Sequence, residues 1–110
     1  MSREALVEPS QKIVVVIDAE IAPLVPAFLA NRRKDVVQMR EALEQKEFQT
    51  LLVTGHGMKG AGGGYGFDAV SEIGRQIELA AKEQNGVEIA RQVDELERYL
   101  DRVEIVTDDS

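Results

Sequence analysis

The stretch that decides the fold of this chain runs from Gly55 to Gly66 and reads GHGMKGAGGGYG. It holds seven of the nine glycines of the chain and its only histidine, His56. Lys59 follows three positions later, and few other side chains lie nearby in the sequence. Such a stretch is either a loop or a helix with most of its side chains removed, and the residues around it decide between the two.

Helical periodicity continues through this glycine-rich stretch. Small or apolar residues recur at intervals of three and four, the spacing of one helix face, at Phe48, Leu51, Gly55, Met58 and Gly62. We therefore predict a helix that begins near Glu47 and continues past His56. At about 100° per residue, His56 lies about 120° from the centre of the apolar face, at an edge that faces solvent or a partner.

The residues that follow His56 on its own face are unusual. Lys59 lies one turn further on, within reach of whatever the imidazole carries. Gly60 and Gly63 lie on the same face and leave it without side chains. Each glycine inside a helix costs about 0.5–1 kcal/mol relative to alanine. Close helix packing would explain the glycines of the inner face, whereas these two indicate a need for access to His56.

The residues before the stretch predict one strand and one helix. Ile13–Ile17 is β-branched throughout and too short for a helix, so it predicts a strand. Pro23 and Pro26 are typical of the first turn of a helix, which should continue to about Lys46. The expected inner face of this helix holds Leu24, Phe28, Val36, Met39 and Leu43.

The residues after the stretch predict two more helices. Asp68 is a candidate N-cap for the third helix, and Asn85-Gly86 predicts its end. The expected inner faces hold Val70, Ile73, Ile77, Ala80 and Ala81 in the third helix and Val93, Leu96, Leu100 and Val103 in the last.

Four amphipathic helices with short connections indicate an all-α fold, an antiparallel up-down four-helix bundle. A short strand at 103–106 could pair with 13–17 and tie the two ends of the chain together. We expect a single domain over residues 13–106, a flexible N-terminus over 1–12 and a tail over 107–110.

The composition argues against several classes of function. The net charge of −7 at pH 7 argues against nucleic acids and anionic membrane surfaces, because both attract basic proteins. The longest apolar run, Ile13–Ile17, is too short to span a bilayer. With one histidine and no cysteine, the chain lacks the usual ligands of a zinc site, so we expect no metal site. The absence of cysteine also fits a cytoplasmic location.

The residues around His56 suit phosphoryl chemistry. A neutral imidazole can carry a phosphoryl group on nitrogen. It then needs an exposed ring nitrogen, a fixed tautomer, a cation for the phosphate and room for a partner's active site. Lys59 could supply the cation, and Gly60 and Gly63 the room. Glu78, on the inner edge of the next helix, is a candidate acceptor for Nδ1–H, which would leave Nε2 free to attack.

The segment His56-Gly-Met-Lys-Gly-Ala-Gly-Gly-Gly-Tyr-Gly66 resembles the H-x-x-K-G-x-x-x-x-x-G core of histidine phosphotransfer (HPt) domains. It looks closest to the phosphoacceptor domain of chemotaxis-type histidine kinases. The resemblance covers roughly residues 21–103, and Glu78 falls without a gap at the position of the glutamate of these domains. The chain departs from the family at residues 62–64, where glycines replace small polar or apolar residues. This difference affects the rigidity of the helix end rather than the role of His56.

The resemblance implies a four-helix bundle that receives phosphate from one aspartate-bearing receiver domain and passes it to another. The chain would then be a phosphoryl carrier in a two-component phosphorelay and not an enzyme, since it has no ATP site of its own. It would bind no cofactor, and Mg²⁺ would be held by the partner receiver domain. We expect a monomer whose partners are receiver domains, a histidine kinase or both.

Two alternatives stay open at this stage. A separate histidine-kinase ATP-binding domain could phosphorylate His56 directly, or the bundle could be an interaction protein whose histidine is never phosphorylated. The segment 55–60 also satisfies G-x-G-x-x-G, but that fingerprint has meaning only after a strand in a βαβ unit. The basic cluster Arg32-Arg33-Lys34 could take part in docking, although a solvated helix face is the favoured explanation.

Overall fold

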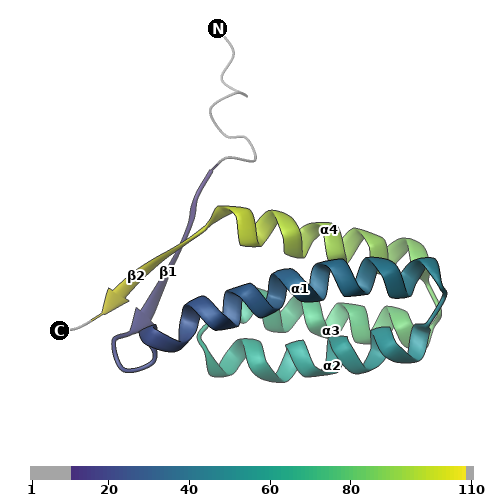
Figure 1. The fold of residues 1–110 in the computed structure, drawn as a ribbon, viewed down its shortest axis with the longest axis horizontal. Coiled ribbons are helices and arrows are strands. Elements are labelled where there is room, and N and C mark those ends of the chain that lie inside the picture. The colour runs from purple at the N-terminus through teal and green to yellow at the C-terminus, as the bar shows by residue number, and fades with distance from the viewer. Residues whose placement is uncertain (1–10, 109–110) are drawn as a thin grey trace, which may run out of the picture.

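Four helices and two short strands make up the described part of the chain, residues 11–108 of a computed structural model. Their bounds are β1 Ile13–Asp18, the 3-10 turn η2 Ala22–Leu24, α1 Val25–Glu44, α2 Phe48–Gly64, α3 Asp68–Lys82, α4 Gly86–Arg102 and β2 Val103–Asp108. Figure 1 shows the helices side by side, with successive helices joined at alternate ends of the bundle. The predicted all-α four-helix bundle is confirmed, and α2 runs through the glycine-rich stretch as the periodicity predicts.

The three connections between helices share one backbone geometry. Each of α1, α2 and α3 ends in a Schellman motif, in which a residue with positive φ follows the C-cap. That residue is Lys46 with φ 57°, Gly66 with φ 85° and Gln84 with φ 55°. The next amide in each case donates back across the turn, as Phe67 does to the Gly62 carbonyl at 2.8 Å. The following helix begins at once, so neighbouring helices are held antiparallel and close.

This geometry corrects two predicted helix boundaries. Asp68 is the first residue of α3, and the N-cap position belongs to Phe67, whose carbonyl accepts from the Ser71 amide. Phe67 is fully buried, so core packing rather than a capping side chain sets this boundary. Asn85-Gly86 does not end α3, which ends at Lys82. It begins α4 instead, with the Asn85 side chain accepting from the Glu88 amide at 3.1 Å.

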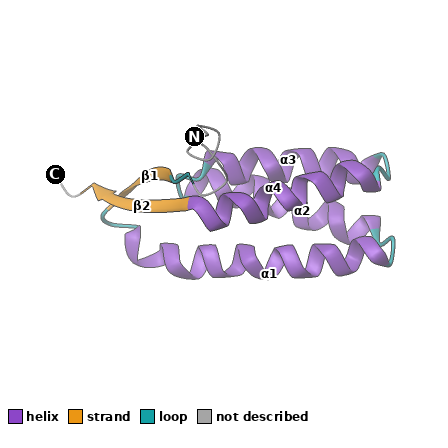
Figure 2. Ribbon diagram, turned by 90° about the horizontal axis from the view of Figure 1, so that it is seen from above, coloured by secondary structure: helices purple, strands orange, loops and turns teal. Residues whose placement is uncertain are grey.

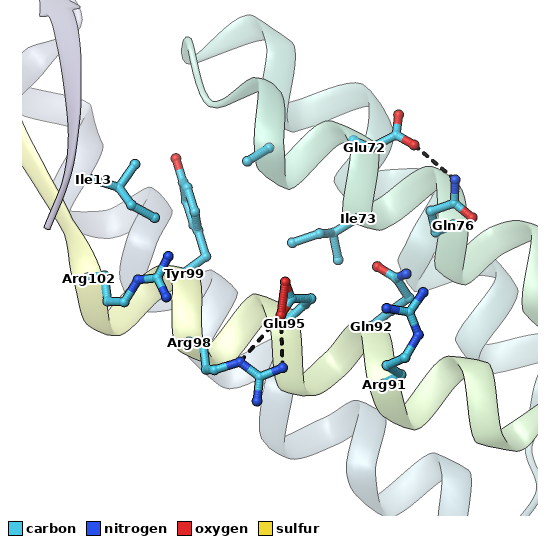
Figure 3. A pocket seen from close by; sticks show the side chains of 11 residues that line it. Ile13, Glu72, Ile73, Gln76, Arg91, Gln92, Glu95, Arg98, Tyr99 and Arg102 are labelled. Atoms are coloured by element: carbon cyan, nitrogen blue, oxygen red, sulfur yellow. Dashed lines mark hydrogen bonds and ion pairs between the residues drawn. The ribbon is translucent and has the colours of Figure 1, made fainter. Parts of the chain in front are cut away.

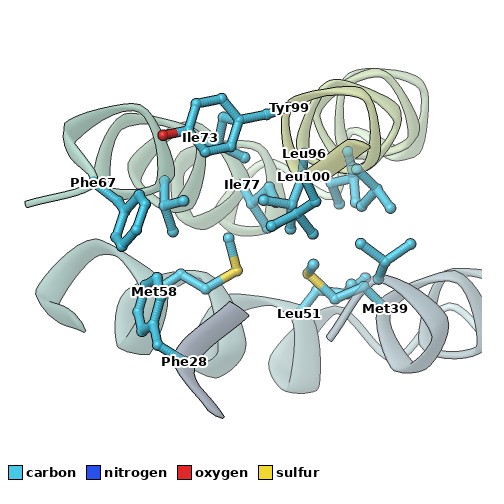
Figure 4. Close-up of a cluster of buried hydrophobic side chains, with 14 of the residues drawn as sticks. Phe28, Met39, Leu51, Met58, Phe67, Ile73, Ile77, Leu96, Tyr99 and Leu100 are labelled. Carbon is cyan, nitrogen blue, oxygen red and sulfur yellow. The ribbon is translucent and has the colours of Figure 1, made fainter. Parts of the chain in front are cut away.

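The core consists of the inner faces of all four helices, and Figure 4 shows its central side chains. The predicted inner faces are confirmed for most positions, including Met39, Leu51, Ile77 and Leu96. The prediction that Leu24 lies on the inner face of the first helix is wrong, because Leu24 lies in the 3-10 turn before α1 and is 53% exposed. Val25 is buried in its place.

Glycines bring α2 and α3 closer together than side chains would permit. A Cβ added to Gly62 would lie 2.6 Å from the Ser71 amide nitrogen, and one added to Gly74 would lie 2.6 Å from the Lys59 amide nitrogen. Gly55 is similarly enclosed by the backbone of α3. The prediction that the inner-face glycines serve close helix packing is therefore confirmed.

The two strands form a parallel pair at one end of the bundle, which we call the β1–β2 ribbon (Figures 1 and 2). Ile13 pairs with Val103 and Asp18 with Asp108, so the predicted pairing of 13–17 with 103–106 is confirmed and extends further. Thr107 and Asp108, part of the predicted tail 107–110, lie in β2. Of the predicted flexible N-terminus 1–12, residues 1–10 fall outside the described residues. No helix among residues 11–108 is long and apolar enough to cross a membrane.

Candidate functional site

His56 lies in the middle of α2, on the edge that faces α3. Its side chain is 66% exposed, and its Nδ1 lies 3.1 Å from Oε2 of Glu78. An ionised carboxylate can only accept hydrogen bonds, so the proton of a neutral ring must sit on Nδ1. Nε2 then carries the lone pair.

Glu78 lies on α3 and contacts two side chains of α2 at once. Its side chain is only 10% exposed, and its second oxygen, Oε1, lies 3.0 Å from Nζ of Lys59. The hydrogen bond from Lys59 is the largest cause of the lowered pKa of Glu78. Burial acts in the opposite direction, and the bond to His56 adds to the lowering. Glu78 is therefore ionised at neutral pH and is a strong acceptor for the imidazole N–H.

The close approach of α2 and α3 positions these three side chains. Gly55 of α2 and Gly74 of α3 face each other across the interface. Gly55 directly precedes His56, and Gly74 lies four residues before Glu78. Ser71, one turn before Gly74, donates its hydroxyl hydrogen bond to the Lys59 carbonyl. Glycine contacts and this hydrogen bond fix the two backbones together, so the distance between His56 and Glu78 does not depend on flexible side chains alone.

The exposed side of α2 beyond His56 lacks side chains, as predicted. A Cβ added to Gly60 would meet no atom within 4 Å, and one added to Gly63 would meet only the Ser71 hydroxyl, at 3.8 Å. Gly57 and Gly64 are equally open. The surface beside the imidazole is therefore bare helix backbone.

The sequence predicts His56, Lys59 and Glu78 as site residues, and the structure brings all three side chains together. The sequence does not identify Ser71 or Gly74, which carry no signal until α3 is placed against α2. Lys59 was expected beside the ring as a cation for phosphate, and in the structure it contacts Glu78. No group of three or more His, Cys, Asp or Glu side chains within residues 11–108 could hold a metal ion.

Two other charged regions contain ion pairs between described residues. In the basic cluster, Arg32 pairs with Asp35 at 2.8 Å, and Arg33 reaches Asp101 and the Leu100 carbonyl. A groove of about 540 Å³ between α3 and α4 is lined by arginines and glutamates (Figure 3). Arg98 and Glu95 in its wall pair with each other at 2.8 Å. None of His56, Lys59 and Glu78 lines this groove.

Comparison with protein families gives a match, whereas two other comparisons do not. Searches of curated proteins and of solved structures find no similar protein. The family model described as Hpt domain matches residues 23–105, which include all four helices and the contacts between His56, Lys59 and Glu78. This family carries out histidine phosphotransfer in two-component signalling, and its members are phosphoryl carriers that interact with receiver domains or kinases. The match spans well over half of the chain, and the chain belongs to the Hpt domain family.

Proposed function

We propose that His56 is the phosphoacceptor of this chain and carries a phosphoryl group between aspartates of receiver domains. The observation that carries the proposal is the bond from Nδ1 to Glu78 on a ring that is 66% exposed. A fixed tautomer and an accessible Nε2 are what a nitrogen nucleophile needs.

In the proposed reaction, Nε2 attacks the phosphorus of an aspartyl phosphate in the receiver. The N–P bond forms while the bond between phosphorus and the aspartate oxygen breaks, and the electron pair leaves with the aspartate carboxylate. The ring gains positive charge as the N–P bond forms, and the carboxylate of Glu78 stabilises that charge. Nδ1 keeps its proton throughout, and the reverse steps return the phosphoryl group to another aspartate.

Lys59 has a second role in this proposal. Its Nζ is 3.0 Å from Glu78 before transfer, and its side chain is 40% exposed. A phosphoryl group on Nε2 would present anionic oxygens one turn away on the same face. These oxygens would compete with Glu78 for the ammonium group. Mg²⁺ would be held by the carboxylates of the receiver.

The surface around His56 suits a protein partner. Gly60 and Gly63 leave room for the loops that surround the receiver's aspartate. Val53, one turn before His56 on α2, is 59% exposed, and Leu79, next to Glu78 on α3, is 43% exposed. Exposed aliphatic side chains on both helices provide the apolar contact that a docked domain needs.

Incubation with phosphorylated receivers, and separately with histidine kinases and ATP, tests the proposal. Because His56 is the only histidine, acid-labile, alkali-stable phosphate that is absent from His56→Gln must be on this residue. We expect transfer from a cognate receiver and none to His56→Gln, with circular dichroism as the control for folding. Labelling by a kinase but by no receiver would favour direct phosphorylation instead. Labelling by neither would leave the bundle as an interaction protein.

A further inference from the structure

The β1–β2 ribbon has one buried face and one exposed face. Ile17 is fully buried, and Val15 and Ile105 pack against the core. On the opposite face Val14 is 59% exposed, Val16 is 61% exposed and Val106 is 45% exposed. Val16 and Val106 are partners in the register, so these three valines form one patch.

This arrangement is unusual for a parallel sheet. Parallel strands normally occur where both faces of the sheet are covered, and a sheet of two strands has little stability by itself. Within residues 11–108 the sheet has only β1 and β2, so each strand has one edge without a strand beside it. Unpaired edge N–H and C=O groups form a template that another extended chain can match.

The charge around the valine patch selects the kind of chain that fits. Asp18 and Glu104 are exposed at the ends of the same face, and neither strand contains a lysine or an arginine. A second copy would bring carboxylates against carboxylates, and each copy carries a net charge of −7. A segment with basic side chains would meet opposite charge at these positions.

We propose that the β1–β2 ribbon docks an extended segment of a partner protein whose outward face carries aliphatic residues at its centre and lysine or arginine at its ends. The segment adds a strand to the ribbon, its backbone pairs with a free edge, and its outward aliphatic side chains extend the patch of Val14, Val16 and Val106. Its basic side chains lie beside Asp18 and Glu104.

This surface is separate from the phosphotransfer site. The ribbon packs at the end of the bundle where α2 ends. Ile17 lies beside Gly66 there, and a Cβ added to Gly66 would lie 3.4 Å from Cδ1 of Ile17. His56 lies eight residues before the last residue of α2, or about 12 Å along the helix axis. A short strand bound to the ribbon therefore leaves the imidazole accessible, so binding can be measured without any phosphate.

The probe for this proposal is the peptide Lys-Thr-Val-Thr-Val-Thr-Lys, which as a strand carries its valines and both lysines on one face. We expect it to bind the whole chain and to slow amide hydrogen exchange in β1 and β2. Val14→Thr/Val16→Thr keeps strand propensity but removes apolar surface, and should weaken binding about tenfold. Glu104→Gln should weaken binding less, and should reduce its dependence on salt. Val87→Thr is the matched control, because Val87 is 84% exposed but lies at the start of α4.

Four outcomes would overturn the proposal. The peptide could fail to slow exchange in either strand, or Val87→Thr could weaken binding as much as the ribbon variants do. Sedimentation could also show self-association that Val14→Thr/Val16→Thr abolishes, which would make a second copy the occupant. An equally tight complex with the same peptide in which serine replaces each valine would reduce the binding to charge alone and would contradict the role of the valines.

Discussion

A single carboxylate, that of Glu78, contacts both candidate site residues of α2. Oε2 accepts from the His56 ring and Oε1 from the Lys59 ammonium group. A charge so little exposed is stable only when it is paired, and here the two partners are the proposed nucleophile and the proposed phosphate ligand. Loss of Glu78 should therefore disturb the chemistry more than the fold.

Replacing Glu78 should slow phosphotransfer. In Glu78→Ala, Nδ1–H loses its acceptor, and we expect the rate of transfer from a phosphorylated receiver to fall by about tenfold or more. The transfer rate of Glu78→Gln should fall less, because the amide oxygen still accepts from Nδ1–H although it carries no charge. Nitrogen-15 NMR of the ring should show the Nδ1–H tautomer in the wild type and a mixture of tautomers in Glu78→Ala.

Glu72→Ala is the matched control for this prediction. Glu72 is also on α3, and its hydrogen bonds from Arg75 and Gln76 lower its pKa to about 2. It does not contact His56, so its removal should leave the transfer rate unchanged. A Glu78→Ala variant that transfers at the rate of Glu72→Ala would contradict the proposed role of Glu78.

The charge on Lys59 should be visible in the titration of Glu78. Its hydrogen bond is the largest cause of the lowered pKa of this glutamate, so Lys59→Ala should raise that pKa towards the ordinary value. Carbon-13 NMR of the carboxyl group measures the change, and Lys82→Ala, on the exposed last turn of α3, is the control. No rise in Lys59→Ala would mean that the contact does not persist in solution.

The same shift predicts how stability depends on pH. The pKa of Glu78 is lower in the folded chain than in the unfolded one, so its ionised form stabilises the fold above its unfolded pKa. This contribution is lost as the pH falls through the folded pKa. The difference in unfolding free energy between the wild type and Glu78→Gln should therefore be largest near neutral pH and should shrink in acid. A difference in unfolding free energy that stays constant from neutral to acid pH would contradict this role of the Glu78 charge.

At the scale of the element, α2 has two glycine-bearing sides with opposite requirements. On its inner side Gly55 and Gly62 meet the backbone of α3, and an added methyl group has no space. On its outer side an added Cβ at Gly57 or Gly60 meets no atom of residues 11–108 within 4 Å. The inner glycines serve packing, and we attribute the outer ones to access for a partner.

The same substitution should therefore have opposite effects on the two sides of α2. Gly60→Ala should raise the unfolding free energy by about 0.5–1 kcal/mol, because alanine favours a helix and no atom obstructs its methyl group. Gly62→Ala should lower it by about 1–3 kcal/mol, since the methyl group would lie 2.6 Å from the Ser71 amide nitrogen. Urea denaturation measures both, and equal signs would contradict the packing described above.

Bulk at Gly60 should affect transfer without harming the fold. Gly60→Leu places a large side chain on the face of His56, where the structure has free space. We expect slower transfer from the receiver and an unfolding free energy no lower than that of the wild type. Leucine placed at Gly64, which is open but two turns past His56, is the control. Unchanged transfer in Gly60→Leu would mean that the receiver does not approach over this face.

Periodicity is enough to predict α2 and its exposed histidine, because the recurrence of small or apolar residues at intervals of three and four can be read from the sequence alone. The boundaries depended on contacts that the sequence does not display. Two of the three Schellman turns place Lys46 and Gln84 at positive φ, where glycine would have given a signal. The burial of Phe67 sets the start of α3 in the same way. The contact between Lys59 and Glu78 needed the actual separation of α2 and α3, which Gly74 determines from the other helix.

At the scale of the whole molecule, the β1–β2 ribbon joins the two ends of the described chain across the end of the bundle. Ile13 and Val103 are 90 positions apart in the sequence and are partners in the register. Closing so long a loop costs entropy that only favourable contacts at its ends can offset. The buried inner face of the ribbon, with Ile17 at its centre, provides those contacts.

Ile17 should therefore contribute more to stability than the ion pairs that join α1 to α4. Ile17→Ala removes a side chain that is 1% exposed and should lower the unfolding free energy by about 2–4 kcal/mol. Arg40→Ala breaks contacts of 2.8 Å with Asp94 and Glu97, but these groups are 43–53% exposed. Solvent screens such pairs, so the loss should stay within about 1 kcal/mol. Urea denaturation compares the two, and hydrogen exchange shows where each variant opens. If Ile17→Ala accelerated exchange only in β1 and β2 and left global unfolding unchanged, the ribbon would be a separately unfolding unit and not part of the bundle's cooperative core.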